Sequence, residues 1–247
     1  MYVEGNPANF TDPSGHIKCL DSKDPNCIRS AKQLFNRAKS LSASVEVGTT
    51  LPVEALAQLV DYAGILFVEK SGIMWGLTNV LIGIDPNKIE VWKLGLKDNY
   101  KIYPKSNPYF VGEDWLKYKL DPSKGARYSE IGDWLPKYWD ETPNQAFHFW
   151  YYAAVEYYDN FGYASSANVV HDPYMFEWFC GEDLEKLKVF ETKPGNITRY
   201  FNETSKEDYL LGLKGIEFGA LMWKQQGRYA YFNPSYWIRA KLSNKNN

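Results

Sequence analysis

Apolar side chains recur along this chain mainly at helical spacing. Asp24-Pro25 is a pair typical of an N-cap followed by proline in the first turn, and an apolar stripe continues from it to Leu41. A Ser, Thr and Gly-rich break over 42–50 precedes a second stripe that begins at Pro52. This pattern predicts two amphipathic helices that pack as neighbours.

Two further segments predict a buried centre. Residues 71–84 carry no charge, but they are too few to span a bilayer and three glycines interrupt them, so they indicate core. Residues 144–160 contain no helix breaker and are apolar on most sides. The second segment is therefore expected to be a central helix enclosed by others.

A last helix is predicted over 205–226. Gly212, Gly215 and Gly219 fall on one face of it. Three interior glycines cost roughly 2 to 3 kcal/mol relative to alanine, so another element must offset that loss. Close approach of the 144–160 helix is the expected reason for this glycine face.

Between the helical blocks, residues 85–143 hold six prolines and many aromatics. A stretch this long predicts an ordered wrap that its aromatic side chains pin to the core and that forms a wall of a cleft. Residues 228–240 alternate loosely and predict a short extended segment, as does the N-terminus. The expected fold is mainly α: one aromatic-rich helical domain with this Pro-rich wrap.

Composition narrows the function classes. The 247 residues are 45% apolar and 23% charged, with a net charge of −2, so no overall field favours a nucleic-acid partner. The sequence contains no stretch of about 20 apolar residues, so no stable membrane span is predicted. The three cysteines form no zinc motif. Either Cys19 and Cys27 form one bridge and Cys180 is left over, or the cysteines are free thiols. No phosphate loop is present, and no cofactor or metal is expected.

Histidines and carboxylates supply the candidate chemistry. They suit a general acid/base set or a His/carboxylate ligand group, but their spacing selects neither. Alternatively, His148 is a hydrogen-bonded core residue. The candidate catalytic residues are His148, Glu156, His171, Asp172 and Asp208, and the candidate substrate-binding residues are Asn144, Trp150 and Trp139.

The first residues carry a recognisable motif. Residues 6–7 are Asn-Pro and residues 12–15 are Asp-Pro-Ser-Gly. This pair, at this spacing, resembles the closing motif of the RHS/YD-repeat core domain, a β-cage that precedes a variable C-terminal module. The resemblance divides the chain into the tail of the core (1–16), a connecting segment with an amphipathic helix (17–50), a helical C-terminal domain (51–240) and a flexible tail (241–247).

The same resemblance implies processing residues. In the family an aspartate pair cuts the chain after the Asp-Pro-x-Gly motif, which places Asp12 as one aspartate and the Gly15–His16 bond as the cut. His16 stands where the family usually has Leu, so the resemblance leaves open whether this chain is cleaved.

The resemblance implies a general class of function and no specific activity. It implies a variable module of a bacterial RHS/YD-repeat protein, often a toxin or effector, that is secreted or at the cell surface as part of a larger protein. The cage of its own parent chain is then its partner, as is an immunity protein if the module is a toxin. The alternatives are a non-catalytic helical binding or structural module, and a glycan or peptide hydrolase.

Overall fold

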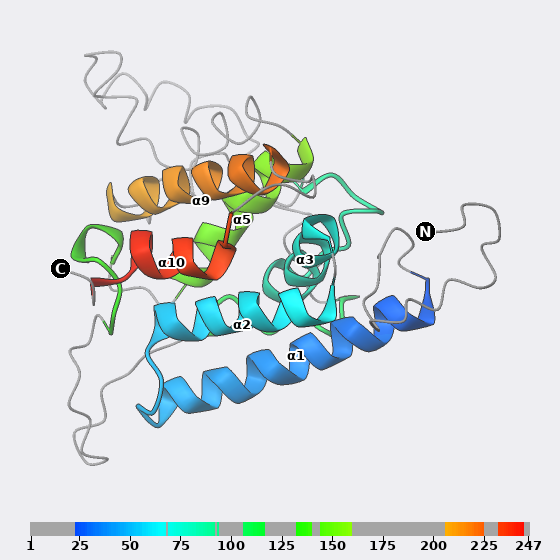
Figure 1. Cartoon of the computed structure of the whole chain (residues 1–247), viewed down its shortest axis with the longest axis horizontal. Coiled ribbons are helices and arrows are strands. Elements are labelled where there is room, and N and C mark those ends of the chain that lie inside the picture. Colours follow the sequence, from blue (N-terminus) through cyan, green and yellow to red (C-terminus); the bar gives the residue numbers. More distant parts are fainter. Residues whose placement is uncertain are drawn as a thin grey trace, which may run out of the picture.

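The computed structural model describes residues 23–67, 69–91, 93, 106–116, 132–139, 144–159, 206–224 and 232–244. Within these ranges the chain is mainly helical, as predicted, and its extended pairing is one isolated bridge between Trp134 and Ser243. The elements shown in Figure 1 are α1 (Pro25–Glu46), α2 (Pro52–Leu66), α3 (Lys70–Leu77), the π-helix η2 (Thr78–Ile82), the 3-10 turn η5 (Pro136–Tyr138), α5 (Gln145–Asp159), α9 (Lys206–Lys224) and α10 (Pro234–Leu242).

Helix α1 begins as predicted and ends later than predicted. The Asp24 carboxylate accepts a hydrogen bond from the backbone N–H of Asn26 at 2.8 Å, and proline occupies the first turn. The helix then continues to Glu46, through half of the expected break at 42–50. It continues because Val45 is buried against the core, which outweighs the weak helical preference of the serines.

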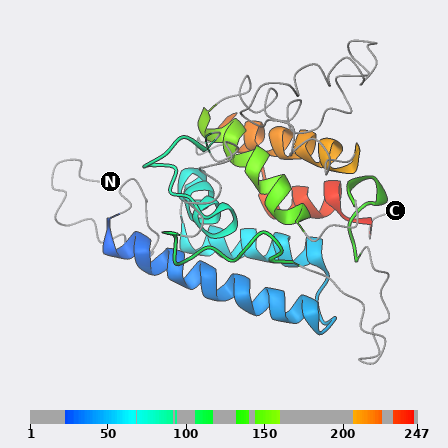
Figure 2. The same cartoon turned by 180° about the vertical axis from the view of Figure 1, so that it is seen from behind.

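The helices stack in an order that brings distant segments together. In Figure 1, α1, α2, α10 and α9 follow one another across the molecule, and Figure 2 shows α5 on the other side of α9 and α10. Helix α2 packs against both α1 and α10, and α5 packs against α9. The predicted pairing of the first two helices is confirmed.

The glycine face of α9 is the contact with α5. A Cβ on Gly215 would collide with the carbonyl oxygen of Phe149, and one on Gly219 would collide with that of Ala153. The contact advances in the same direction along both helices, so they run parallel where they cross. Gly215 and Gly219 therefore confirm the predicted close approach to the 144–160 helix.

The prediction of an extended segment over 228–240 is wrong for its second half. Helix α10 occupies 234–242, with Pro234 in its first turn and the Asn233 side chain accepting from the N–H of Tyr236 at 3.0 Å. Trp237 is buried against the core. The Asn-Pro start is a helix signal that the loose aromatic alternation concealed.

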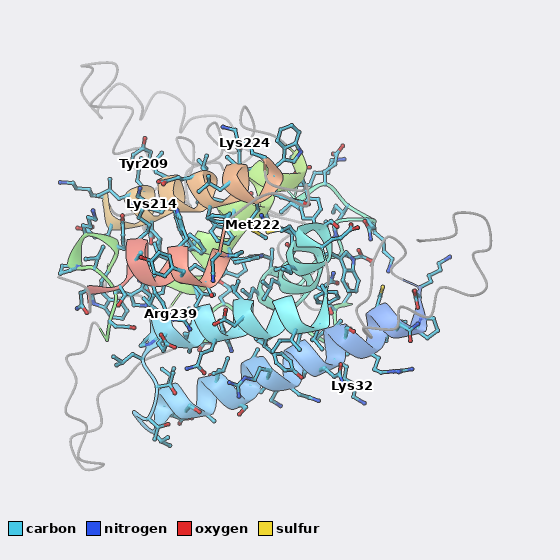
Figure 3. All side chains as sticks on the ribbon, viewed as in Figure 1. Lys32, Tyr209, Lys214, Met222, Lys224 and Arg239 are labelled. Atoms are coloured by element: carbon cyan, nitrogen blue, oxygen red, sulfur yellow. The ribbon has the colours of Figure 1, made fainter. Side chains whose placement is uncertain are left out.

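An ion cluster fastens α10 to α2. The Arg239 guanidinium donates to both carboxylate oxygens of Glu54, at 2.8 and 3.0 Å, and to Asp61 at 3.1 Å. Figure 3 shows Arg239 reaching from α10 toward α2. Ser235 also donates a hydrogen bond to Asp61. These bonds hold α10 in position against α2. The paired carboxylates raise the pKa of Arg239 further above its already high value.

The described parts of the wrap are pinned to the core, as predicted. Trp115 is buried and donates from Nε1 to the carbonyl of Ala38 at 2.7 Å, and the N–H of Val111 donates to the carbonyl of Val80 at 3.1 Å. Residues 92, 94–105, 117–131 and 140–143 of the wrap lie outside the described residues.

Candidate functional site

A cavity of about 940 Å³ lies where the start of α1, the end of α3, η2 and two parts of the wrap meet. Its size falls at the upper end of the range for small-molecule sites, roughly 300 to 1,000 Å³. Its walls are Ile28, Ala31, Trp75, Asn79, residues 83–90, Lys93 and residues 106–109. The prediction that the wrap forms the wall of a cleft is confirmed for these residues.

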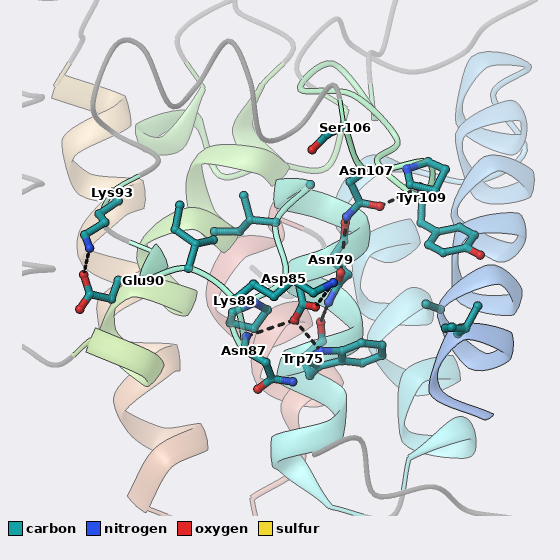
Figure 4. Close-up of a pocket in the computed structure, with 17 residues that line it drawn as sticks. Trp75, Asn79, Asp85, Asn87, Lys88, Glu90, Lys93, Ser106, Asn107 and Tyr109 are labelled. Carbon is teal, nitrogen blue, oxygen red and sulfur yellow. Dashed lines mark hydrogen bonds and ion pairs between the residues drawn. The ribbon is translucent and has the colours of Figure 1, made fainter. Parts of the chain in front are cut away.

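Asp85 organises one side of the cavity. Its carboxylate accepts hydrogen bonds from Nε1 of Trp75 and from the N–H of Asn87, both at 3.1 Å, and pairs with Lys88 at 3.1 Å (Figure 4). The chain reaches this position through Gly83, whose φ of 79° ends the π-helix in the left-handed region. Asp85 thus fixes both the loop and the Trp75 ring.

The π-helix η2 supplies a second polar side chain of the cavity wall, that of Asn79. Its wide turn bonds the N–H of Gly83 to the carbonyl of Thr78, five residues back, at 3.2 Å. Asn79 on this turn donates from Nδ2 to the Trp75 carbonyl at 3.0 Å. Asn107 of the wrap in turn donates from Nδ2 to the Asn79 carbonyl at 3.1 Å and contacts its Oδ1 at 3.4 Å. Two carboxamides therefore meet at the cavity.

The hydroxyl of Tyr158, near the end of α5, is buried. The Tyr158 Oη makes no hydrogen bond within the described part of the chain. Burial, then the neighbouring Tyr157, then Asp85 raise the pKa of Tyr158 well above its ordinary value. The phenol is therefore neutral at physiological pH and adds no charge.

The structure brings two of the predicted catalytic residues together. Nδ1 of His148 on α5 lies 4.0 Å from Oδ1 of Asp208 on α9, and both side chains are largely buried. The His148 ring also packs against Tyr152, with 5.0 Å between ring centroids. A carboxylate at this position would stabilise a protonated imidazole.

Glu156 lies apart from that pair. It is eight residues beyond His148 on α5, roughly 12 Å along the helix axis. Its Oε2 is buried without a hydrogen-bond partner in the described residues. Burial raises the pKa of Glu156, and the charge of Lys224 on α9 partly opposes that shift.

We expect Glu156→Gln to stabilise the protein at pH 8. Because the folded-state pKa is raised, ionisation of Glu156 reduces stability as the pH rises above its ordinary value near 4.5, and the loss is absent at lower pH. The gain should be a few tenths to about 1 kcal/mol at pH 8 and should vanish near pH 4. Urea unfolding at both pH values measures it. Glu46→Gln, at an exposed site, is the control; equal effects of both variants at pH 8 would contradict the assignment.

The predicted substrate-binding residues occupy different environments. Trp150 is fully buried, and its Nε1 donates to the Thr78 hydroxyl at 3.4 Å, which argues against direct contact with a ligand. Trp139 packs partly buried against the core, and Asn144 accepts from the N–H of His148 at 2.9 Å at the start of α5. His171, Asp172, Asp12, Gly15, His16, Cys19 and Cys180 lie outside the described residues.

The sequence reasoning missed Asn79, Asp85 and Asn107. One signal for Asn79 was present, because an amide inside an otherwise uncharged buried run must be hydrogen-bonded. Asp85-Pro-Asn likewise has the composition of an Asx turn. Asn107-Pro-Tyr has the same composition, and the Asn107 Oδ1 accepts from the N–H of Tyr109 at 2.9 Å. The contact of Asn107 with Asn79, 28 residues away, had no local signal.

Cys27 is disulfide-bonded and fully buried. The predicted alternative of a free thiol at this position is wrong. Its partner lies outside the described residues. The bridge fixes the first turn of α1, which carries the cavity residue Ile28.

Neither a cluster of metal ligands nor a membrane-spanning helix occurs within the described ranges. Among those residues, no group of three or more His, Cys, Asp or Glu side chains is placed to hold a metal ion. None of the described helices combines the length and the apolar character needed to cross a bilayer.

Comparison with known proteins gives no evidence on function, so the function is argued from the residues of this chain. No protein-family model, curated protein or solved structure matches this chain. The RHS/YD-repeat resemblance of residues 6–15 therefore stays a prediction.

Proposed function

We propose that this chain is the variable C-terminal module of a bacterial RHS/YD-repeat protein, an effector that acts by binding a ligand in the cavity beside Asp85. The observation that carries the binding role is the cavity itself: about 940 Å³, with Asp85, Asn79 and Asn107 held in place by hydrogen bonds within its wall. Polar groups that are oriented before a ligand arrives lower the entropic cost of binding it.

Two other features agree with this role. A π-helix is rare and often occurs at functional sites, and here η2 carries Asn79 into the cavity wall. The disulfide at Cys27 suits export, because disulfides persist in oxidising compartments. Delivery to the cell surface or the exterior as part of a larger protein is therefore included in the proposal.

The second candidate is a hydrolase that uses His148 and Asp208. Their 4.0 Å approach favours it, because a carboxylate beside an imidazole is a common acid/base arrangement. The aromatic residues weaken its sugar-binding form. Among the described residues of the wrap, Trp115, Trp134 and Tyr138 are buried in the core and cannot stack on a substrate.

Expression of the full chain in bacteria distinguishes these functions. We expect the expressed chain to arrest growth. We expect Asn87→Trp to restore survival by about tenfold or more, because the indole ring would occupy the cavity and lower the affinity of the protein for its ligand by at least that factor. Asn87 is exposed and lines the cavity, and only its backbone N–H bonds to Asp85. Colony counts after induction give the measurement.

The matched control is Asn26→Trp. Asn26 is also exposed and also donates its backbone N–H to the aspartate two residues earlier, but it does not line the cavity. It should leave the growth arrest unchanged, as should His148→Ala with Asp208→Asn. Relief by the His148 and Asp208 changes alone would favour the hydrolase, and growth without arrest would remove the effector role.

A further inference from the structure

The charges that line the cavity compensate one another in pairs. Lys88 lies 3.1 Å from Asp85, and Lys93 lies 2.6 Å from Glu90. Figure 4 shows the Lys93–Glu90 pair at one edge of the site and the Lys88–Asp85 pair nearer its centre. The wall therefore presents no excess of either charge, and a phosphate or a strongly charged ligand would have to compete with an existing ion pair.

The apolar part of the wall is aliphatic. Both aromatic residues of the wall already contact other residues. The Trp75 ring is hydrogen-bonded to Asp85 and packs edge-on against Phe67, and Tyr109 packs edge-on against Phe35. A sugar site needs an open ring face, so this arrangement disfavours a glycan. The aliphatic and proline side chains of the wall are Ile28, Ala31, Ile84, Ile89, Pro86 and Pro108.

The polar part of the wall matches a peptide group. Asn79 Nδ2 donates to the Trp75 carbonyl and Asn107 Oδ1 accepts from the N–H of Tyr109 at 2.9 Å, so the groups that face each other across the site are one donor, Asn107 Nδ2, and one acceptor, Asn79 Oδ1. This pairing of a donor with an acceptor matches that of a backbone amide. The 3.4 Å contact between Asn107 Nδ2 and Asn79 Oδ1 is long for a hydrogen bond. A ligand with adjacent N–H and C=O groups can replace this weak contact with two better ones.

We propose that the cavity binds a short, uncharged peptide segment with aliphatic side chains, supplied by another protein. This inference rests on the binding function proposed above and assigns its ligand class. Aliphatic side chains would contact the isoleucines and prolines, and the peptide backbone would bond to Asn79 and Asn107. Neutral side chains would leave the two ion pairs intact.

Selection from a displayed library of random seven-residue peptides tests the ligand class. The full chain with its disulfide intact should enrich neutral sequences rich in Leu, Ile, Val and Ala. Binding of a synthesised peptide from that pool, with blocked ends, should weaken about tenfold or more in Asn87→Trp and stay unchanged in Asn26→Trp. Enrichment of charged peptides, no enrichment, or equal binding by the two variants would overturn the inference.

Maltotriose and ATP are the comparison probes. Binding of either that is lost in Asn87→Trp would reject the peptide while leaving a binding function for the cavity. The binding function itself fails by a different result: growth arrest that Asn87→Trp does not relieve. The two proposals can therefore be judged separately.

Discussion

Gly215→Ala is expected to destabilise the protein by about 3 kcal/mol, although alanine is the better helix former by about 1 kcal/mol. The new methyl group would collide with the carbonyl oxygen of Phe149 and lie 3.0 Å from the Cβ of Tyr152. Backbone atoms cannot rotate away as a side chain end can, so α5 and α9 must separate. Urea unfolding and thermal melting measure the loss, about 6 to 12 °C for a chain of this size.

Gly64→Ala is the matched control for that experiment. Gly64 also lies in a helix, α2, but a Cβ there would meet one side-chain atom of Ile73 at 4.0 Å. Here the helical preference acts alone, and the variant should gain about 0.5 to 1 kcal/mol. Equal effects of the two substitutions would show that α5 and α9 do not approach as closely as described.

The contrast between these glycines shows what local sequence can predict. Glycines three and four residues apart on one helix face imply a close neighbour, and the breaker-free apolar helix at 145–159 was an identifiable partner. Helix starts at Pro25 and Pro52 were equally local signals. Each depends on a few adjacent residues, so each can be recognised without knowing the fold.

The candidate site depended on contacts that no local pattern encodes. The cavity is formed by α1, the α3–η2 segment and the wrap, which are brought together only by folding. His148 and Asp208 were both identified from the sequence, but they lie 60 positions apart, so no local pattern indicated that they pair or that Glu156 lies apart from them. Side-chain types were thus predictable, whereas their grouping was not.

Asp133→Ala should cost about 3 kcal/mol of folding free energy, because it removes two charge-assisted hydrogen bonds from a buried helix start. Helix α2 has no side-chain cap of its own at Leu51. Asp133 supplies one from the wrap, accepting from the N–H of Val53 at 2.8 Å and from that of Glu54 at 3.2 Å. Its carboxylate is buried, so water cannot replace the lost acceptor.

The loss should exceed that of an ordinary local cap. Asp24→Ala removes the cap of α1 at an exposed site and should cost about 1 kcal/mol. Asp133→Asn keeps one acceptor and should fall between the two in urea unfolding. Asp133 also joins the wrap to the C-terminus, since its carbonyl accepts from the N–H of Asn244 at 3.0 Å, and this backbone bond survives both substitutions. If Asp133→Ala costs no more than Asp24→Ala, the carboxylate does not cap α2, and the wrap is held by its backbone bonds and aromatic packing alone.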